Sequence, residues 1–118
     1  MFKDNVPIYV QIATDIKQKI LSGFLKENDK LPSIREHSIS YSVTVLTVQR
    51  AIALLENEGI IKTKKGIGSF VEDGVSDKLK NSMVIEEIKN FIANLSKSGL
   101  SKDELSQLIK EALNDFYK

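Results

Sequence analysis

The stretch LPSIREHSISYSVTVLTVQRAIALLENE, from Leu31 to Glu58, decides the fold because it predicts two short helices joined by a tight turn. Ser33 and Glu36 form a capping box, in which the serine hydroxyl accepts from the glutamate backbone amide and the carboxylate reaches back to the serine amide. The first helix is therefore expected to begin just after Pro32. The pattern breaks off at Tyr41 to Val43, which predicts the turn.

The second helix is expected from about Val45 to Glu58. Thr44 offers a hydroxyl cap ahead of it. Apolar residues then recur with helical spacing, at Val48, Ala51, Ile52 and Leu55. Because this stripe has to face a core, the other side of the helix stays outside near its start. That outer side and its edge carry Thr44, Val45, Leu46, Thr47 and Gln49.

Two helices with so short a connection match a helix-turn-helix, whose second helix enters the major groove of DNA. Gln49 is able to pair in two-point fashion with adenine, and the hydroxyls of Thr44 and Thr47 suit phosphate oxygens. Exposed Val45 and Leu46 are able to pack on thymine methyl groups. The stretch therefore predicts a DNA-reading helix.

The flanking segments complete a domain of this kind. Pro7 suits the first position of a helix, and isoleucines recur every fourth residue behind it, at Ile8, Ile12, Ile16 and Ile20. After the motif, IIKTKKGIGSFV (residues 60–71) predicts two strands around a tight glycine turn, the form of a wing. Three lysines in this segment face no acid within it, and Gly66 and Gly68 permit close approach to a phosphate or a minor groove.

The run LPSIRE, followed by VTVLTVQRA, LLENEGII and KKGIGSFV, resembles the winged-helix DNA-binding domain of the GntR family of bacterial transcription regulators. The resemblance covers roughly Pro7 to Val71, and the short remainder resembles the YtrA-like subfamily. It implies a mainly α fold with a small β-wing (α+β) and a regulator, expected to be a repressor that excludes polymerase from an operator. Arg35 resembles the family arginine that contacts the operator. Arg50 either contacts a phosphate or pairs with an acid such as Glu36.

The predicted DNA-binding set joins the second helix, the cap of the first and the wing. Its members are Ser33, Arg35, Thr44, Val45, Leu46, Thr47, Gln49, Arg50, Lys64, Lys65 and Gly66. At Val45, Leu46 and Gln49 the sequence departs from the family pattern, which often has polar or arginine residues there. We therefore expect an operator sequence different from the usual one.

Residues 75–118 predict two amphipathic helices, the first from about Val75 to Leu95 and the second after another capping box at Ser101 and Glu104. No third element covers their apolar stripes, so the hairpin is expected to pair with the same hairpin of another chain as a homodimer. The predicted interface residues are Ile88, Phe91, Ile92, Leu95, Leu108, Ile109, Leu113 and Phe116. The expected domains are residues 1–74, a winged helix-turn-helix, and residues 75–118, a dimerisation hairpin.

Composition argues against most other classes. A chain of 118 residues with no cysteine and a net charge of +1 has little room for a catalytic domain and no bulk charge for nucleic acid. His37 is the single histidine, so no metal or cofactor is expected, and nothing indicates an enzyme. A cytoplasmic location is expected, because no apolar run approaches the roughly 20 residues that cross a bilayer. Two alternatives stay open: a winged-helix module that binds a protein through Val45 and Leu46, and, less favoured, a small-molecule effector in the C-terminal interface.

Overall fold

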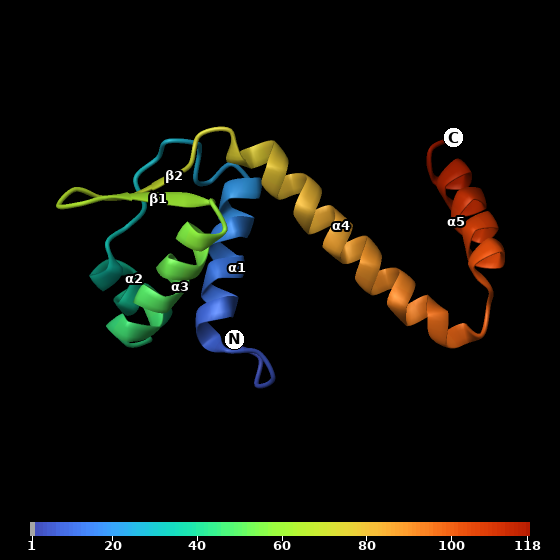
Figure 1. Cartoon of the computed structure of the whole chain (residues 1–118), viewed down its shortest axis with the longest axis horizontal. Coiled ribbons are helices and arrows are strands. Elements are labelled where there is room, and N and C mark those ends of the chain that lie inside the picture. The colour runs from blue at the N-terminus through green and yellow to red at the C-terminus, as the bar shows by residue number, and fades with distance from the viewer. Residues whose placement is uncertain (1) are drawn as a thin grey trace. The chain divides into compact units, whose positions relative to one another are not determined.

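The computed structural model describes residues 2–118 and confirms the predicted class, a mainly helical chain with one small antiparallel sheet (Figure 1). The elements in chain order are α1 (Ile8–Leu21), α2 (Ile34–Tyr41), α3 (Val45–Asn57), β1 (Ile61–Lys64), β2 (Gly68–Val71), α4 (Val75–Leu95), η1 (Ser96–Ser98) and α5 (Lys102–Phe116). They divide into two compact units at Asn81 and Ser82. Within residues 2–118 no single helix has the length and apolar composition of a membrane span, and α2 with α3 pass that test only as a pair bent by 115°.

The core of the first unit lies between α1 and α3, which also contacts α2 and β1 (Figure 1). The isoleucine stripe of α1 is buried at Ile12, Ile16 and Ile20, and the stripe of α3 at Val48, Ala51, Ile52 and Leu55. An ion pair of 2.8 Å between Lys17 and Glu58 closes the same interface at the end of α3. Burial of the stripes therefore sets which side of α3 faces outward.

The turn of the helix-turn-helix is built from short-range polar contacts. In the capping box of α2, the Ser33 amide donates to the Glu36 carboxylate and the Glu36 amide donates to the Ser33 hydroxyl, each at 3.0 Å. Ser42 ends α2 in the left-handed conformation, with φ 56°, a region that non-glycine residues seldom adopt. The Ser38 hydroxyl then donates to the Val43 carbonyl at 2.5 Å, which holds the chain as it leaves the turn.

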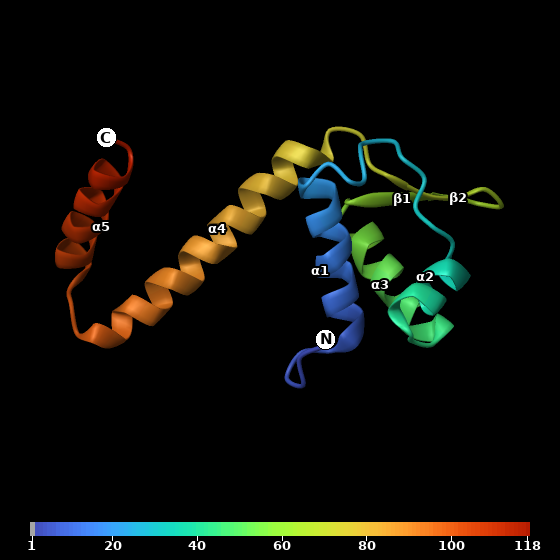
Figure 2. The ribbon, with the colours of Figure 1, turned by 180° about the vertical axis from the view of Figure 1, so that it is seen from behind.

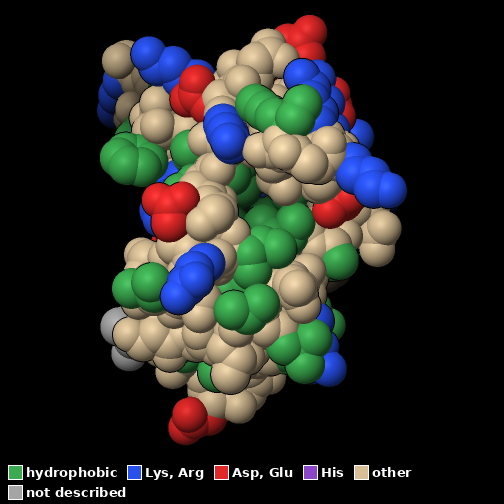
Figure 3. Space-filling model, turned by 90° about the vertical axis from the view of Figure 1, so that its left-hand side faces the viewer, with side chains coloured by type: hydrophobic (Ala, Val, Ile, Leu, Met, Phe, Trp, Pro, Cys, Tyr) green, Lys and Arg blue, Asp and Glu red, His purple; other side chains and the backbone are tan. Residues whose placement is uncertain are grey.

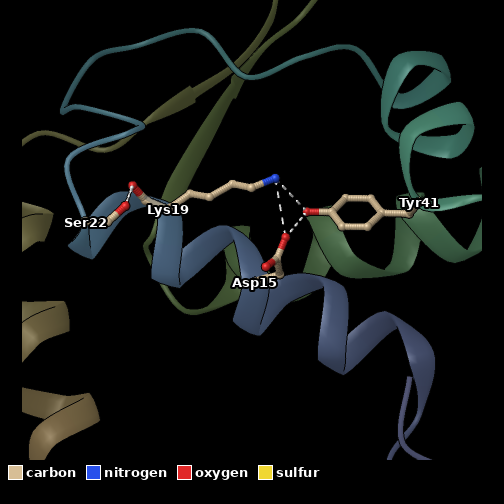
Figure 4. Close-up of polar contacts among 4 residues, drawn as sticks. All are labelled: Asp15, Lys19, Ser22 and Tyr41. Carbon is tan, nitrogen blue, oxygen red and sulfur yellow. Dashed lines mark hydrogen bonds and ion pairs between the residues drawn. The ribbon is translucent and has the colours of Figure 1, made fainter. Parts of the chain in front are cut away.

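A polar cluster ties α2 to α1 (Figure 4). The Tyr41 hydroxyl donates to Asp15 at 2.5 Å, and the Lys19 ammonium lies 3.3 Å from the same hydroxyl and 3.4 Å from the same carboxylate. Burial raises the pKa of Tyr41, and its hydrogen bond to Asp15 raises it further. The phenol therefore stays a donor, and the end of α2 is held to α1.

The wing is a hairpin whose register pairs Ile61 with Val71 and Lys64 with Gly68. A segment of the loop between α1 and α2 pairs with the free edge of β2. The Leu31 amide donates to the Ser69 carbonyl at 2.8 Å, and the Val71 amide donates to the Asp29 carbonyl at 2.9 Å. This loop therefore lies against the wing and ends in the Ser33 cap of α2.

The start of α4 belongs to the first unit, because Val75 and Leu79 are buried in it. The Glu27 carboxylate accepts from the backbone amides of Gly74 and Ser76, each at 3.0 Å. These bonds lower the pKa of Glu27. The first compact unit thus runs past Gly74, where the sequence places the end of the DNA-binding domain. The roles assigned to the two domains stay predictions.

The second unit contains the rest of α4, the turn at η1, and α5 (Figure 2). The predicted capping box of α5 is present, with the Ser101 amide donating to Glu104 at 3.0 Å. Within residues 82–118 the structure buries no side chain. The apolar stripes are therefore open to solvent or half-buried.

We expect the cap of α2 to make stability depend on acid pH. Hydrogen bonds from Ser33 lower the pKa of Glu36 below 4.5, so this cap stabilises the fold above that pH and stops doing so as pH falls through the lowered value. Glu36→Gln keeps an acceptor for Ser33 without titrating. Thermal unfolding followed over pH should show a shallower acid loss for Glu36→Gln than for the unsubstituted chain.

Glu56→Gln, an exposed substitution in α3 outside any capping box, is the matched control and should keep the original acid profile. Identical profiles for Glu36→Gln and Glu56→Gln would show that the cap makes no pH-dependent contribution.

Candidate nucleic-acid interface

The outward residues at the start of α3 lie where the sequence predicts. The Thr44 hydroxyl accepts from the Thr47 amide at 3.2 Å and lies 2.9 Å from the Thr47 hydroxyl. Val45 is 45% exposed and Leu46 is 56% exposed, and Gln49 is exposed one turn further on. The helix therefore presents two hydroxyls, two aliphatic side chains and one amide on its outer side, the groups that read base edges and phosphates.

Ser33 and Arg35 lie at the start of α2, and both are exposed. The hydrogen bonds from Ser33 are the main cause of the lowered Glu36 pKa, and the charge of Lys30 adds to it. Glu36 is therefore held as a carboxylate in its own cap. Within residues 2–118 no acid forms an ion pair with Arg35, so its guanidinium is available to a ligand.

Arg50 lies apart from these groups. It lines a shallow depression with Tyr9 of α1 and Asn57 at the end of α3. The alternative ion pair with Glu36 does not form, since that carboxylate caps α2. Among the residues that the structure describes, Arg50 forms no other ion pair. Its phosphate contact stays a prediction, at a place separate from Gln49.

The wing supplies Lys64, Lys65 and Gly66, all exposed. The Lys64 ammonium lies 4.7 Å from the centre of the Phe70 ring, a cation–π contact that holds the lysine along the hairpin. Lys62 instead forms an ion pair of 3.7 Å with Glu72. Lys64 and Lys65 are therefore the wing lysines without an acidic partner in residues 2–118.

A cleft of about 850 Å³ separates the wing from the start of α2. Four of the predicted residues line it: Ser33, Arg35, Lys64 and Gly66. Figure 3 shows one face of the molecule, with hydrophobic side chains gathered near its middle and both basic and acidic side chains around them. Lys30, which the sequence analysis missed, also lines the cleft. Its only signal in the sequence is a lysine directly before LPS.

His37 is packed inside the first unit and is 4% exposed. Its ring stacks on Tyr41 with centroids 5.8 Å apart, and its Nδ1 atom has no hydrogen-bond partner within residues 2–118. Burial lowers the pKa of His37, so the neutral ring is favoured. In residues 2–118 no group of three or more histidine and acidic side chains is placed to hold a metal ion.

This geometry is that of a winged-helix DNA-binding protein, with an exposed second helix beside a basic hairpin. Residues 8–71 match the family described as bacterial regulatory proteins, gntR family. The chain belongs to the GntR family. It is therefore a DNA-binding transcription regulator and not an enzyme.

Relatives match along nearly the whole chain. The HTH-type transcriptional repressor YtrA of Bacillus subtilis is 34% identical over 96% of this chain and 89% of its own length. A GntR family transcriptional regulator from Listeria monocytogenes has a solved structure with TM-score 0.80, 35% identity and coverage of 93% of this chain and 98% of its own. The DNA-binding domain of AraR in complex with operator ORX1 matches with TM-score 0.57 and 26% identity, over 60% of this chain and 92% of its own.

We expect Gln49 and Lys65 to contribute in different ways. Gln49→Ala should weaken a preferred duplex by about 1 to 3 kcal/mol, through loss of readout at one base position. Lys65→Ala should weaken all sequences similarly and flatten the dependence on salt. Both are measurable by titrating a duplex that the unsubstituted chain selects from a random library, and its single-base variants.

Gln18→Ala, an exposed glutamine on α1, is the matched control and should bind as the unsubstituted chain does. If neither Gln49→Ala nor Lys65→Ala differs from this control, the assigned face is wrong.

Proposed function

We propose that the chain is a homodimeric repressor that binds a palindromic operator through the start of α3 and the wing. The observation that carries this proposal is the single face on which the exposed groups of Arg35, Lys64 and Gly66 flank one cleft. The similarity to a repressor, YtrA, and to an operator-bound domain, that of AraR, supports it. Repression follows from occupancy, since a protein lying on the promoter excludes polymerase. The proposed repressor then acts in the bacterial cytoplasm, where its operator lies.

The base-reading and phosphate roles divide by position. Gln49, Val45 and Leu46 are proposed to meet base edges in the major groove, since they project from the outer side of α3. Hydroxyl and cationic groups of α2, α3 and the wing, with the caps of the two helices, are proposed to hold the phosphates. These are Ser33, Arg35, Thr44, Thr47, Arg50, Lys64 and Lys65, with the backbone at Gly66.

The homodimer is supported by the exposed stripes of the second unit. Phe91 is 56% exposed on α4 and Leu113 is 53% exposed on α5. Burying a large apolar side chain is worth about 1.5 to 3 kcal/mol, so a set of this size offsets an association cost of roughly 4 to 15 kcal/mol. The proposed interface comprises Ile88, Phe91, Ile92, Leu95, Leu108, Ile109, Leu113 and Phe116.

We propose no small-molecule effector for the second unit. An apolar cavity of about 450 Å³ lies within the second unit, and its lining includes Phe91, Leu108 and Leu113. These side chains belong to the surface that a second chain would cover, so a ligand there would compete with assembly. Two-fold symmetric pairing also matches the half-sites that helix-turn-helix dimers read.

A second candidate function rests on Val45 and Leu46, two aliphatic side chains exposed side by side at the start of α3. A protein partner would cover them in place of thymine methyl groups. Selection from a random duplex library separates the two functions. Enrichment of an inverted repeat, bound more weakly as salt rises, supports the repressor, whereas no enrichment supports the protein-binding module.

We expect Phe91→Glu combined with Leu113→Glu to give a monomer. Placing carboxylates in the proposed interface would bury charge without a partner, which costs more than the contact gains. Sedimentation at micromolar concentration should show a dimer for the unsubstituted chain and a monomer for the double variant. Operator affinity should fall by about 10² to 10⁴, because the second half-site is no longer effectively intramolecular.

Phe24→Glu is the matched control, since Phe24 is 75% exposed in the first unit. This variant should remain a dimer. A double variant that stays dimeric, or an unsubstituted chain that is monomeric, would place the interface elsewhere.

A further inference from the structure

We propose that the cleft between the wing and α2 seats the sugar–phosphate backbone of one DNA strand, and that Lys30 is its phosphate ligand. This inference rests on the proposed DNA-binding function and adds a contact from a third element, the loop between α1 and α2. Lys30 lies outside both the reading helix and the wing, the two elements that the sequence analysis assigned to DNA together with the cap of α2.

The charges around the cleft are complementary to a phosphate. Its lining includes three cations, Lys30, Arg35 and Lys64, which come from the loop, α2 and β1. None of the three forms an ion pair within residues 2–118. Glu36 is the one acid among the lining residues, and both Ser33 contacts hold it in the cap of α2. The cleft therefore carries a local excess of positive charge that the near-neutral chain as a whole lacks.

Backbone pairing brings Lys30 to the wing. Lys30 forms an isolated antiparallel bridge with Phe70, and the next residue, Leu31, donates its amide to the Ser69 carbonyl at 2.8 Å. The lysine is thus an edge residue of the hairpin sheet, although it lies far from the hairpin in sequence. Lysine is common at sheet edges, where it deters pairing with other strands, but here it also lines a cleft.

Gly68 lies directly beside the end of the Lys30 side chain. A methyl group on Gly68 would come within 2.8 Å of Lys30 Cε, so the flexible end of the lysine would have to shift away. The glycine also has φ +143°, a conformation that favours glycine over other residues. The end of the Lys30 side chain therefore lies against the bare backbone of Gly68.

The floor of the cleft suits a deoxyribose more than a base edge. Leu31, Ile34 and Ile52 contribute apolar surface to the lining, while the cations contribute charge. A sugar–phosphate strand presents this combination, an apolar sugar face between anionic groups. The cleft also overlaps the set of residues proposed to hold phosphates, since Ser33, Arg35, Lys64 and Gly66 belong to both.

The test uses the full chain, with Lys30→Gln, Lys30→Arg and the control Lys26→Gln, an exposed lysine of the same loop that does not line the cleft. The probes are a duplex selected by the unsubstituted chain from a random library and a scrambled duplex. Lys30→Gln should weaken both equally, by roughly threefold to tenfold at moderate salt. The slope of log affinity against log salt should fall by about one for each protomer bound. Lys30→Arg should restore most of the slope, and Lys26→Gln should change neither quantity.

Ethylation of single phosphates on the selected duplex locates the contact. One phosphate in each half-site should interfere with the unsubstituted chain but not with Lys30→Gln, while the others keep their effect. Unchanged affinity, slope and interference in Lys30→Gln would overturn the inference. A loss of affinity confined to the selected duplex would overturn the inference as well, since that result indicates a base contact.

These outcomes are distinct from failure of the proposed function. If the unsubstituted chain selects no duplex, DNA recognition itself is refuted. If it selects a duplex and Lys30→Gln binds that duplex unchanged, only the phosphate contact is refuted. A thermal unfolding curve for Lys30→Gln that matches the unsubstituted chain confirms that the comparison concerns binding.

Discussion

Burial of the apolar stripe of α3 against α1 is the constraint on which the rest of the first unit depends. Leu55 and Val48 are inaccessible to solvent on one side of the helix, and Ile12 and Ile16 are equally buried across from them. With about 1.5 to 3 kcal/mol for each such side chain, the helix has one favoured rotation about its axis. Its outer side is then fixed as well. Gln49 follows Val48 directly, so rotating the reading side inward would require exposing the core.

Polar contacts then set the direction in which this helix begins. Ser42 in the left-handed conformation ends α2, and Thr44 caps α3 two residues later. The Tyr41 hydroxyl, held neutral by a raised pKa, binds Asp15 of α1 from the same turn. These directed bonds add to the apolar packing and hold the end of α2 against α1. Apolar packing and directed hydrogen bonds together explain why a small unit with an aliphatic core presents the outward residues of α3 in one arrangement.

The features predictable from sequence are those with a local signature. Both capping boxes, the stripe of α3 and the glycine turn of the wing depend on residues within a few positions of each other, and the structure contains each of them. The features missed depend on residues far apart. Glu27 bonds amides 47 and 49 residues ahead, and Lys30 reaches the hairpin through edge pairing. An amphipathic pattern also does not reveal which unit the first turns of a helix pack against. The burial of Val75 and Leu79 of α4 in the first unit was therefore not predicted.

The loop between α1 and α2 is mostly polar because it forms hydrogen bonds to other elements. Glu27 accepts from the start of α4, Asp29 and Leu31 pair with β2, and Ser33 caps α2. One short segment therefore supports three elements, each of which would otherwise end in unpaired backbone groups. A hydrophobic loop of the same length would pack but not satisfy those groups. The Glu27 carboxylate is in this way placed by a structural need, and Lys30, which lies on the same edge of the sheet, is the residue that we propose binds a DNA phosphate.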